Sequence, residues 1–351
     1  MVRVLYGVAG EGSGHSSRAR VIINHLIGRG HEVRVVSYGQ GYENLKSIFE
    51  VEKIFGLRFF YEQGRIKKRD TFFKNLKSIP EASAALRKVL DIIDHWQPGL
   101  VFSDFEPLSC IAANLKRIPL VSIDNQHRIT NARINYPQKY KKEAQLAKAV
   151  INLMIFNSKA CLVTSFFKAR PTNKKTFFFP PILRNEILSA QVSEGDFVLV
   201  YFTSSEFKPV LDILRSLDQL FIVYGFGGRT RDSNLLFRDY SQEGFVKDLV
   251  TSRAVVASAG FTLITESLYL GKPYFAIPVA GQFEQVLNAY YLKKLGYGDY
   301  SDEPNKKSIE NFLYDLDKYR ANLRHYPREN NSKIFNMIDL LIEQHTSSHD
   351  F

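Results

Sequence analysis

A glycine-rich run near the start of the chain carries a histidine that could act as a base. Residues 7–15 read GVAGEGSGH and lie between a short apolar stretch and a segment with helical periodicity. Glycines let the backbone approach a ligand, and the free N–H groups at a helix start favour negative charge. The same helix end disfavours protonation of His15, so a neutral imidazole could accept a proton. The alternative is a histidine that only caps or packs, but its place in a glycine loop favours the catalytic interpretation.

The glycine run on its own also fits a dinucleotide-binding fingerprint. An acidic residue would then be expected at the end of the second strand, where it would bind the ribose of NAD. The second predicted strand leads instead to Tyr38, Gly39 and Gln40. This pattern argues against NAD as the ligand.

A second run, at residues 258–273, reads SAGFTLITESLYLGKP. It predicts a strand, a glycine turn, a helix, a glycine stop and a strand that begins with proline. The turn at Gly260 places free N–H groups and the Thr262 hydroxyl at a helix start, which suits phosphate oxygens. Glu266 lies one turn deeper, where its carboxylate could accept both hydroxyls of a ribose. The alternative, a solvated or capping glutamate, fits less well because the neighbouring residues are apolar.

A third run, at residues 278–288, reads PVAGQFEQVLN. It follows a predicted strand and opens a helix with three polar side chains suited to sugar hydroxyls, Gln282, Glu284 and Gln285. A solvated helix start would look equally polar, so this run is a weak signal in isolation.

These motifs lie on alternating strands and helices, which predicts an α/β fold with parallel sheets. Strands are expected at 3–7, 32–37, 100–103, 120–123 and 160–164, and then at 197–202, 220–224, 254–257 and 274–278. Helices are expected at 16–27, 262–270, 284–295 and 332–345. Two Rossmann-like domains of this kind would face each other across a cleft, with ligands beyond the carboxyl ends of the strands.

Charge and proline content place the boundary between the two domains. Pro180 and Pro181 interrupt any regular element near residues 177–184. Residues 1–184 carry 30 Lys and Arg against 14 Asp and Glu, a net of +16, whereas residues 185–351 carry 17 against 22, a net of −5. We therefore predict an N-terminal domain at 1–184 and a C-terminal domain at 185–351 with a closing C-terminal helix.

The remaining composition indicates a folded cytoplasmic protein. The chain is 45% apolar and 24% charged, and its richest apolar stretch, residues 147–167, is broken by lysines and asparagines. The apolar stretch at the N-terminus is too short for a signal peptide. Cys110 and Cys161 lie far apart in apolar surroundings, which favours two buried reduced thiols over a disulfide or a metal site.

Taken together, the runs resemble GT-B glycosyltransferases, especially the branch with the lipid-II-forming N-acetylglucosaminyltransferase and the UDP-glucuronosyltransferases. Closer still, the chain is similar to a small archaeal and bacterial group of UDP-glycosyltransferases. The likeness spans nearly the whole chain and rests on residues 6–15, 103–107, 122–125, 181–184 and 260–288. The last of these blocks is its specific part.

The resemblance implies a donor site and a base. Donor contacts would come from Gly12, Ser13, Gly14, Thr203, Ser204, Ser205, Phe245, Val246, Ser258, Gly260, Phe261, Thr262, Glu266, Gln282, Glu284 and Gln285. Of these, Phe245 and Val246 match positions that contact uracil through the backbone. His15 matches the base of the glucuronosyltransferase-like members, and Asp104 ends the strand that supplies its orienting acid. Glu11 and Glu106 also offer carboxylates, so the identity of the base stays open.

In such an enzyme an acceptor hydroxyl attacks the anomeric carbon as the nucleotide diphosphate leaves, with inversion. No Asp-x-Asp pair lies in a suitable loop, so we expect no metal and no cofactor, with a UDP-sugar as substrate. Two alternatives are a GT-B-fold UDP-sugar epimerase, which would act without an acceptor, and a non-catalytic nucleotide-sugar-binding protein, which would not turn over. No groove-reading or stacking module is present, so nucleic acid is not an expected partner.

Basic and aromatic residues alternate in residues 58–77. Such a segment suits a surface that rests on anionic lipid, which would place the protein on the inner face of the cell membrane with a glycan or lipid-linked acceptor. A solvated basic loop, or an anionic polysaccharide acceptor, would explain the charge equally well.

Overall fold

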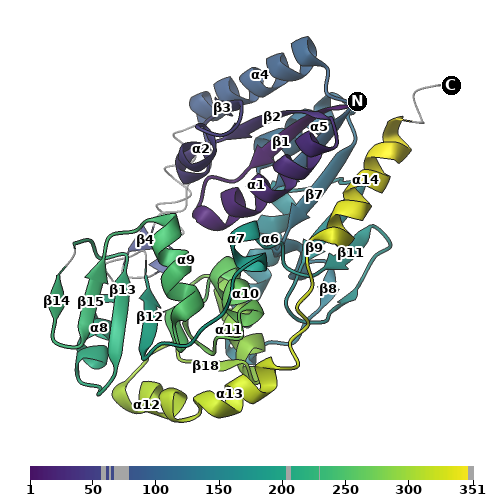
Figure 1. The fold of residues 1–351 in the computed structure, drawn as a ribbon. Coiled ribbons are helices and arrows are strands. Elements are labelled where there is room, and N and C mark those ends of the chain that lie inside the picture. The colour runs from purple at the N-terminus through teal and green to yellow at the C-terminus, as the bar shows by residue number, and fades with distance from the viewer. Residues whose placement is uncertain (57–60, 63–64, 67–78, 203–206, 229, 347–351) are drawn as a thin grey trace.

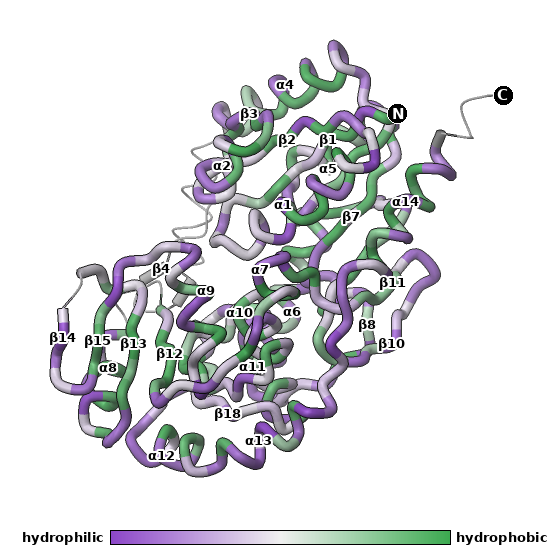
Figure 2. The backbone as a smooth tube through the Cα atoms, viewed as in Figure 1, coloured by the Kyte–Doolittle hydropathy of each residue, from purple (hydrophilic) through white to green (hydrophobic). Residues whose placement is uncertain are grey.

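The chain folds around two seven-stranded sheets, one in each half (Figure 1). The structure is a computed structural model that describes residues 1–56, 61–62, 65–66, 79–202, 207–228 and 230–346. Figure 2 shows central strands such as β12 and β13 as largely hydrophobic segments, whereas helices such as α12 and α14 alternate in polarity. That contrast is expected when parallel strands are covered on both faces and helices bury one side.

The first sheet is parallel throughout, in the order β11-β9-β7-β6-β1-β2-β3. Its strands are β1 (Arg3–Val8), β2 (Glu32–Ser37), β3 (Val51–Lys53), β6 (Leu100–Asp104), β7 (Leu120–Asp124), β9 (Ala160–Thr164) and β11 (Thr176–Phe179). The accompanying helices are α1 (Ser13–Gly28), α2 (Gly39–Leu45), α4 (Ile79–Trp96), α5 (Pro107–Leu115) and α6 (Lys141–Met154). Short elements are β4 (Tyr61–Glu62), β5 (Arg65–Ile66), β8 (Ala132–Arg133), β10 (Arg170–Pro171), η1 (Gln126–Arg128) and η2 (Gln138–Tyr140).

The second sheet has the order β14-β15-β13-β12-β16-β17-β18, and only its edge strand β14 is antiparallel. Its strands are β12 (Phe197–Tyr201), β13 (Leu220–Tyr224), β14 (Arg231–Asp232), β15 (Leu235–Arg238), β16 (Ala254–Ser258), β17 (Tyr274–Ile277) and β18 (Gly298–Tyr300). The helices are α7 (Asn185–Leu188), α8 (Lys208–Arg215), α9 (Gln242–Thr251), α10 (Phe261–Tyr269), α11 (Phe283–Lys294), α12 (Lys306–Tyr314), α13 (Leu316–Leu323) and α14 (Ser332–Thr346). The predicted α/β class with two Rossmann-like sheets is confirmed.

One of the buried apolar clusters spans both halves of the chain. Ile151 of α6 and Phe167 of the first half belong to the same buried cluster as Ile264 of α10 and Leu287 of α11. Burying a side chain of this size stabilises the folded state by about 1.5–3 kcal/mol. Packing between α6, α10 and α11 therefore contributes to holding the halves together.

The final helix returns to the first half. Ile338 of α14 is fully buried in one cluster with Ile22 of α1 and Tyr6 of β1, and Figure 1 shows α14 beside the strands of the first sheet. The His25 ring stacks on Phe335 with centroids 4.1 Å apart. The predicted boundary at 184/185 falls between the two sheets, and the chain crosses that boundary a second time between α13 and α14. No helix in the described ranges is both long and apolar enough to cross a bilayer.

Candidate active site

His15 and Asp104 meet where two neighbouring strands end. β1 and β6 are adjacent, with Val8 paired to Asp104, and α1 begins shortly after β1. Gly12 precedes α1 with φ 75°, a left-handed conformation that favours glycine. The turn places Nδ1 of His15 2.6 Å from Oδ1 of Asp104. The side chain of His15 is 14% exposed, whereas that of Asp104 is fully buried.

Asp104 sets the tautomer of His15. Nδ1 also lies 3.2 Å from Nη2 of Arg18, and these two contacts imply opposite proton positions. The contact with the carboxylate is shorter and its acceptor is anionic, so we place the proton on Nδ1, donated to Asp104. Nε2 is then left with a lone pair, which is the form of histidine that can accept a proton.

Arg18 holds the Asp104 carboxylate from the other side. Its Nε donates to Oδ2 over 2.8 Å, and its Nη2 donates to Oδ1. Burial lowers the pKa of the Arg18 guanidinium, but the carboxylate of Asp104 more than offsets this and leaves that pKa raised. Arg18 lies three positions after His15 on α1, so both side chains share one helix face. Sequence reasoning missed Arg18, although this spacing was a usable signal.

A chain of hydrogen bonds runs from this pair into the second half. Nη1 of Arg18 donates to the Asn125 side chain over 3.0 Å, and Nδ2 of Asn125 donates to Oε1 of Glu284 over 2.6 Å. Gln126 donates to the other oxygen of Glu284 over 3.0 Å. Glu284, predicted to face a donor sugar, is thus bound by residues of the first half that follow β7.

The start of α10, in the second half, faces the glycine run across the junction between the two halves. A Cβ added to Gly14 would lie 2.7 Å from Oγ1 of Thr262, so the two loops are nearly in contact. Gly260 is the N-cap of α10 and no side chain caps this helix. A Cβ at Gly260 would meet no atom within 4 Å. Open space therefore adjoins backbone N–H groups at the positive end of the helix, which is a favourable place for an anion.

Glu266, predicted to bind a ribose, is engaged by the protein itself. Nη2 of Arg184 donates to its Oε2 over 2.7 Å, and the Glu266 side chain is 3% exposed. Burial raises the pKa of the Glu266 carboxyl, and Arg184 offsets only part of that rise. A ribose could reach Glu266 only if the side chains around it moved.

Gln285 and Gln282 support loops in this structure. Oε1 of Gln285 accepts from the backbone N–H groups of Ala259 and Val279 over 3.2 and 3.0 Å. Its Nε2 donates to Oε1 of Gln282 over 2.8 Å. Gln285 therefore fixes the turn before α10 to the turn before α11, a role that spacing alone did not reveal.

Of the other predicted donor contacts, four lie in packed surroundings. Phe245 is buried, with its ring 5.2 Å from that of Tyr224, and its N–H donates to the Ser241 carbonyl over 2.9 Å. The Ser258 carbonyl accepts from the Tyr274 hydroxyl over 2.6 Å. Phe261 belongs to the apolar cluster that spans both halves, and Val246 is partly buried against that cluster. Ser13 begins α1 next to Gly12 and is exposed. Thr203, Ser204 and Ser205 lie outside the described residues.

The two other candidate bases differ in their surroundings. Glu106 is fully buried and caps α5, accepting from the N–H groups of Leu108 and Ser109 over 2.9 and 2.6 Å. Burial raises the pKa of its carboxyl, but both of its oxygens are committed to the cap. Glu11 is half-buried in the glycine run.

Arg128, which sequence reasoning also missed, links the two halves close to the turn before α10. It is fully buried, and its Nη2 donates to Oδ1 of Asn288 over 2.6 Å. The Phe261 ring lies 4.7 Å from its guanidinium carbon. Asn288 in turn donates to the carbonyl of Ala259 over 2.9 Å. Burial lowers the pKa of Arg128 to about 10. Arg128 thus positions the turn that carries Gly260.

A second buried pair lies on the neighbouring strand. Oδ2 of Asp124 accepts from Nδ1 of His127 and from the Ser122 hydroxyl, each over 2.6 Å. Burial lowers the pKa of His127, but Asp124 more than compensates and leaves it raised. Within the described ranges, no three His, Cys, Asp or Glu side chains are grouped as a metal site would require.

Known proteins are similar to this chain over most of its length. The family model described as Glycosyl transferase family 1 matches residues 2–317. An uncharacterized glycosyltransferase of Methanosarcina acetivorans is 23% identical over 86% of this chain and 87% of its own length. A UDP-N-acetylglucosamine–N-acetylmuramyl-(pentapeptide) pyrophosphoryl-undecaprenol N-acetylglucosamine transferase of Bacillus cereus is 24% identical over 98% of this chain and 99% of its own.

Solved structures are similar over almost the whole length. The glycosyltransferase of kitacinnamycin superposes with a TM-score of 0.70 at 15% identity, covering 96% of this chain and 98% of that one. MurG of Acinetobacter baumannii superposes with a TM-score of 0.63 at 16% identity, covering 97% and 99%. The predicted GT-B fold is confirmed.

Proposed function

Because this chain belongs to glycosyl transferase family 1 and is a glycosyltransferase, we propose that it transfers a sugar from a UDP-sugar to a hydroxyl group. The transfer would invert the anomeric carbon and need no metal. The observation that carries this proposal is the junction between the halves. The His15–Asp104 pair lies on one side of it, and the open start of α10 lies on the other, with Gly14 close against Thr262.

The chemistry follows from these positions. Nε2 of His15 takes the proton of the acceptor hydroxyl while the hydroxyl oxygen bonds to the anomeric carbon. The bond from that carbon to the diphosphate oxygen breaks, and the leaving diphosphate carries its negative charge to the N–H groups of α10. Asp104, which accepts hydrogen bonds from Arg18, holds the proton on Nδ1 of His15 and stabilises the imidazolium that forms. A base on the face opposite the leaving group gives inversion.

We further propose a glycan or lipid-linked acceptor on the inner face of the cell membrane. The relative from Bacillus cereus is named for an acceptor that contains pyrophosphoryl-undecaprenol. The first half of this chain carries a net charge of +16, from 30 basic and 14 acidic residues, which favours an anionic acceptor or surface. Of the basic segment at 58–77, the structure describes only β4 and β5.

The test begins with the donor, because ligand binding raises apparent stability by mass action. A panel of nucleotide-diphosphate sugars should reveal one that raises the melting temperature. With that donor and a polyprenyl-linked acceptor, His15→Ala should lower turnover by about 10²–10⁴-fold, the usual share of a general base, and leave donor affinity nearly unchanged.

His95→Ala is the matched control, because His95 is exposed at the end of α4 and bonds only to the Asp91 carbonyl among described residues. Normal turnover in His15→Ala would assign the base to another group, with Glu11 the first to test.

A further inference from the structure

A basic pocket lies at the opposite end of the second sheet from the candidate active site. It has a volume of about 330 Å³, within the range of small-molecule sites. Lys272 follows α10 and precedes β17, and Arg253 precedes β16, so the pocket adjoins the amino ends of these strands. The open start of α10, by contrast, lies beyond their carboxyl ends. None of the residues that line the pocket belongs to the candidate active site.

The pocket concentrates positive charge in a half of the chain that is acidic overall. Five cations line it, together with the single carboxylate of Glu194: Arg253, Lys272, Arg320, Arg324 and Arg328. Residues 185–351 contain 22 acidic and 17 basic residues, and four of their eight arginines are in this pocket. Like charges repel, so this arrangement is costly unless something anionic offsets it.

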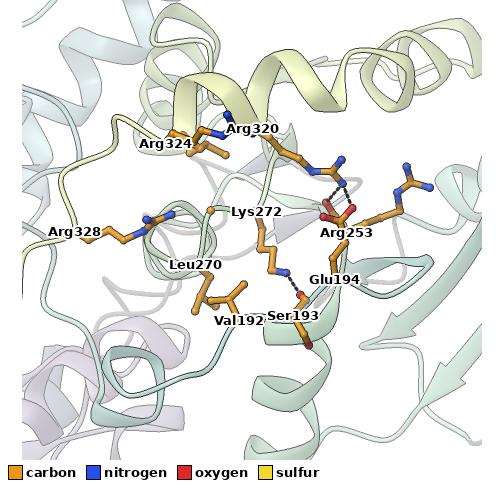
Figure 3. Close-up of a pocket in the computed structure, with 11 residues that line it drawn as sticks. Val192, Ser193, Glu194, Arg253, Leu270, Lys272, Arg320, Arg324 and Arg328 are labelled. Atoms are coloured by element: carbon orange, nitrogen blue, oxygen red, sulfur yellow. Dashed lines mark hydrogen bonds and ion pairs between the residues drawn. The ribbon is translucent and has the colours of Figure 1, made fainter.

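Only part of this charge is neutralised by the protein. Figure 3 shows Arg320 directed at Glu194 on one side, with Arg324 and Arg328 around the rest of the hollow. Nε of Arg328 donates to the Tyr269 carbonyl over 2.8 Å. Within the described part of the chain, no side-chain hydrogen bond or ion pair is made by Arg324, and the buried Nε of Arg253 has no acceptor.

Lys272 is the most buried of the five cations. It is 4% exposed, and its ammonium donates to the Ser193 carbonyl over 2.6 Å. Burial lowers its pKa to about 8, and Glu194 offsets only part of that shift. An ammonium group has three donors, so Lys272 retains donors for a ligand.

We propose that this pocket is a second binding site, for a ligand that carries phosphate groups. Guanidinium groups match phosphate oxygens in pairs, and such charge-assisted hydrogen bonds are about twice as strong as neutral ones. The guanidinium of Arg324 and the remaining donors of Lys272 are the groups that would bind it. Val192, Leu270 and Leu323 supply an apolar wall for the body of the ligand. The phosphate could belong to a free small molecule or to a lipid headgroup.

Calorimetric titration with inorganic pyrophosphate tests the site, with UDP present in excess so that the diphosphate position at the start of α10 is already filled. Arg324→Ala/Arg328→Ala should weaken pyrophosphate binding at least tenfold. The control, Lys306→Ala/Lys307→Ala, makes the same charge change at exposed positions of α12 in the same half and should bind as wild type. Arg324→Ala alone breaks no side-chain hydrogen bond or ion pair within the described residues, so it tests the site if the double variant does not fold. UDP affinity should be unchanged in all three.

Equal pyrophosphate affinity in the arginine variants and the lysine control would overturn the proposal. Because UDP binding is measured separately, failure here is distinguishable from failure of the proposed function. Flotation with phosphatidic acid vesicles and with phosphatidylcholine vesicles then shows whether the phosphate belongs to a lipid headgroup or to a soluble molecule. Loss of phosphatidic acid binding in the arginine variants supports a headgroup ligand. Vesicle binding that does not depend on these arginines, with pyrophosphate binding that does, supports a soluble one.

Discussion

Replacing Gly260 with alanine should separate donor binding from folding. Gly260 has φ −67° and ψ 134°, which alanine adopts without strain, and a Cβ there meets no atom within 4 Å. Alanine has less conformational freedom than glycine in the unfolded chain, which stabilises the folded protein by about 0.4–1 kcal/mol. Alanine is a poorer N-cap than glycine, which costs about 1 kcal/mol. The free energy of unfolding should therefore stay within about 1 kcal/mol of wild type.

Binding should respond much more strongly. The new methyl group would occupy space beside the N–H groups on which we place the diphosphate. Each charge-assisted hydrogen bond lost costs about 1.5–3 kcal/mol, which raises Kd by a factor of about 10 to 150. Titration calorimetry with UDP measures this Kd, and chemical denaturation measures stability.

Gly28→Ala is the matched control for this experiment. A Cβ at Gly28 also meets no atom within 4 Å, and Gly28 is the last residue of α1, far from its glycine-rich start. UDP affinity should be unchanged in this variant. An unchanged Kd in a folded Gly260→Ala protein would refute the assignment of the diphosphate to the start of α10.

Three further predictions concern the same enzyme. Glu266→Gln should weaken UDP binding about tenfold or more through loss of a charged acceptor, whereas Glu266→Ala would also leave Arg184 buried without its partner, at about 3–5 kcal/mol. Unchanged UDP affinity in calorimetry would remove Glu266 from the donor site. Activity should survive exhaustive chelation, and loss that magnesium or manganese restores would contradict metal independence. Replacing Lys67, Lys68 and Arg69 with Glu should release the protein from anionic vesicles, and wild-type binding should weaken as salt rises, because exposed charges are screened over about 8–10 Å. Equal sedimentation of the wild type with neutral and anionic vesicles would contradict membrane binding and indicate that the basic charge binds a soluble acceptor.

The sequence predicted those parts of the fold whose signal is local. Long apolar strands such as β1 and β12 and the helix α10, bounded by glycine turns, lie within one or two residues of the predicted ranges. Edge strands were missed because they are short and mixed in polarity. β3 reads VEK and β18 reads GDY, and neither carries an apolar run or a clear alternation.

The same distinction between local and distant signals applies to the residues of the candidate site. The resemblance implied that Asp104 orients His15, and the two side chains meet because parallel strands bring their carboxyl ends to one edge of a sheet. The partner of Glu266 could not, because Arg184 lies 82 residues away and reaches it across the junction. Arg128 was missed for a similar reason, since its role depends on Asn288, 160 residues further along.

The return of α14 to the first sheet has a consequence for synthesis on the ribosome. Domains generally fold as they emerge, beginning with the N-terminal one. Here the apolar face of α1 and β1 is covered in part by Ile334, Ile338 and Ile342, which are made after the whole of the second sheet. The core of the first half therefore closes only after α14 has been made, and part of that face stays open to water or to a chaperone until then. A chain that stops before α14 would carry the whole active-site junction yet leave this face permanently uncovered.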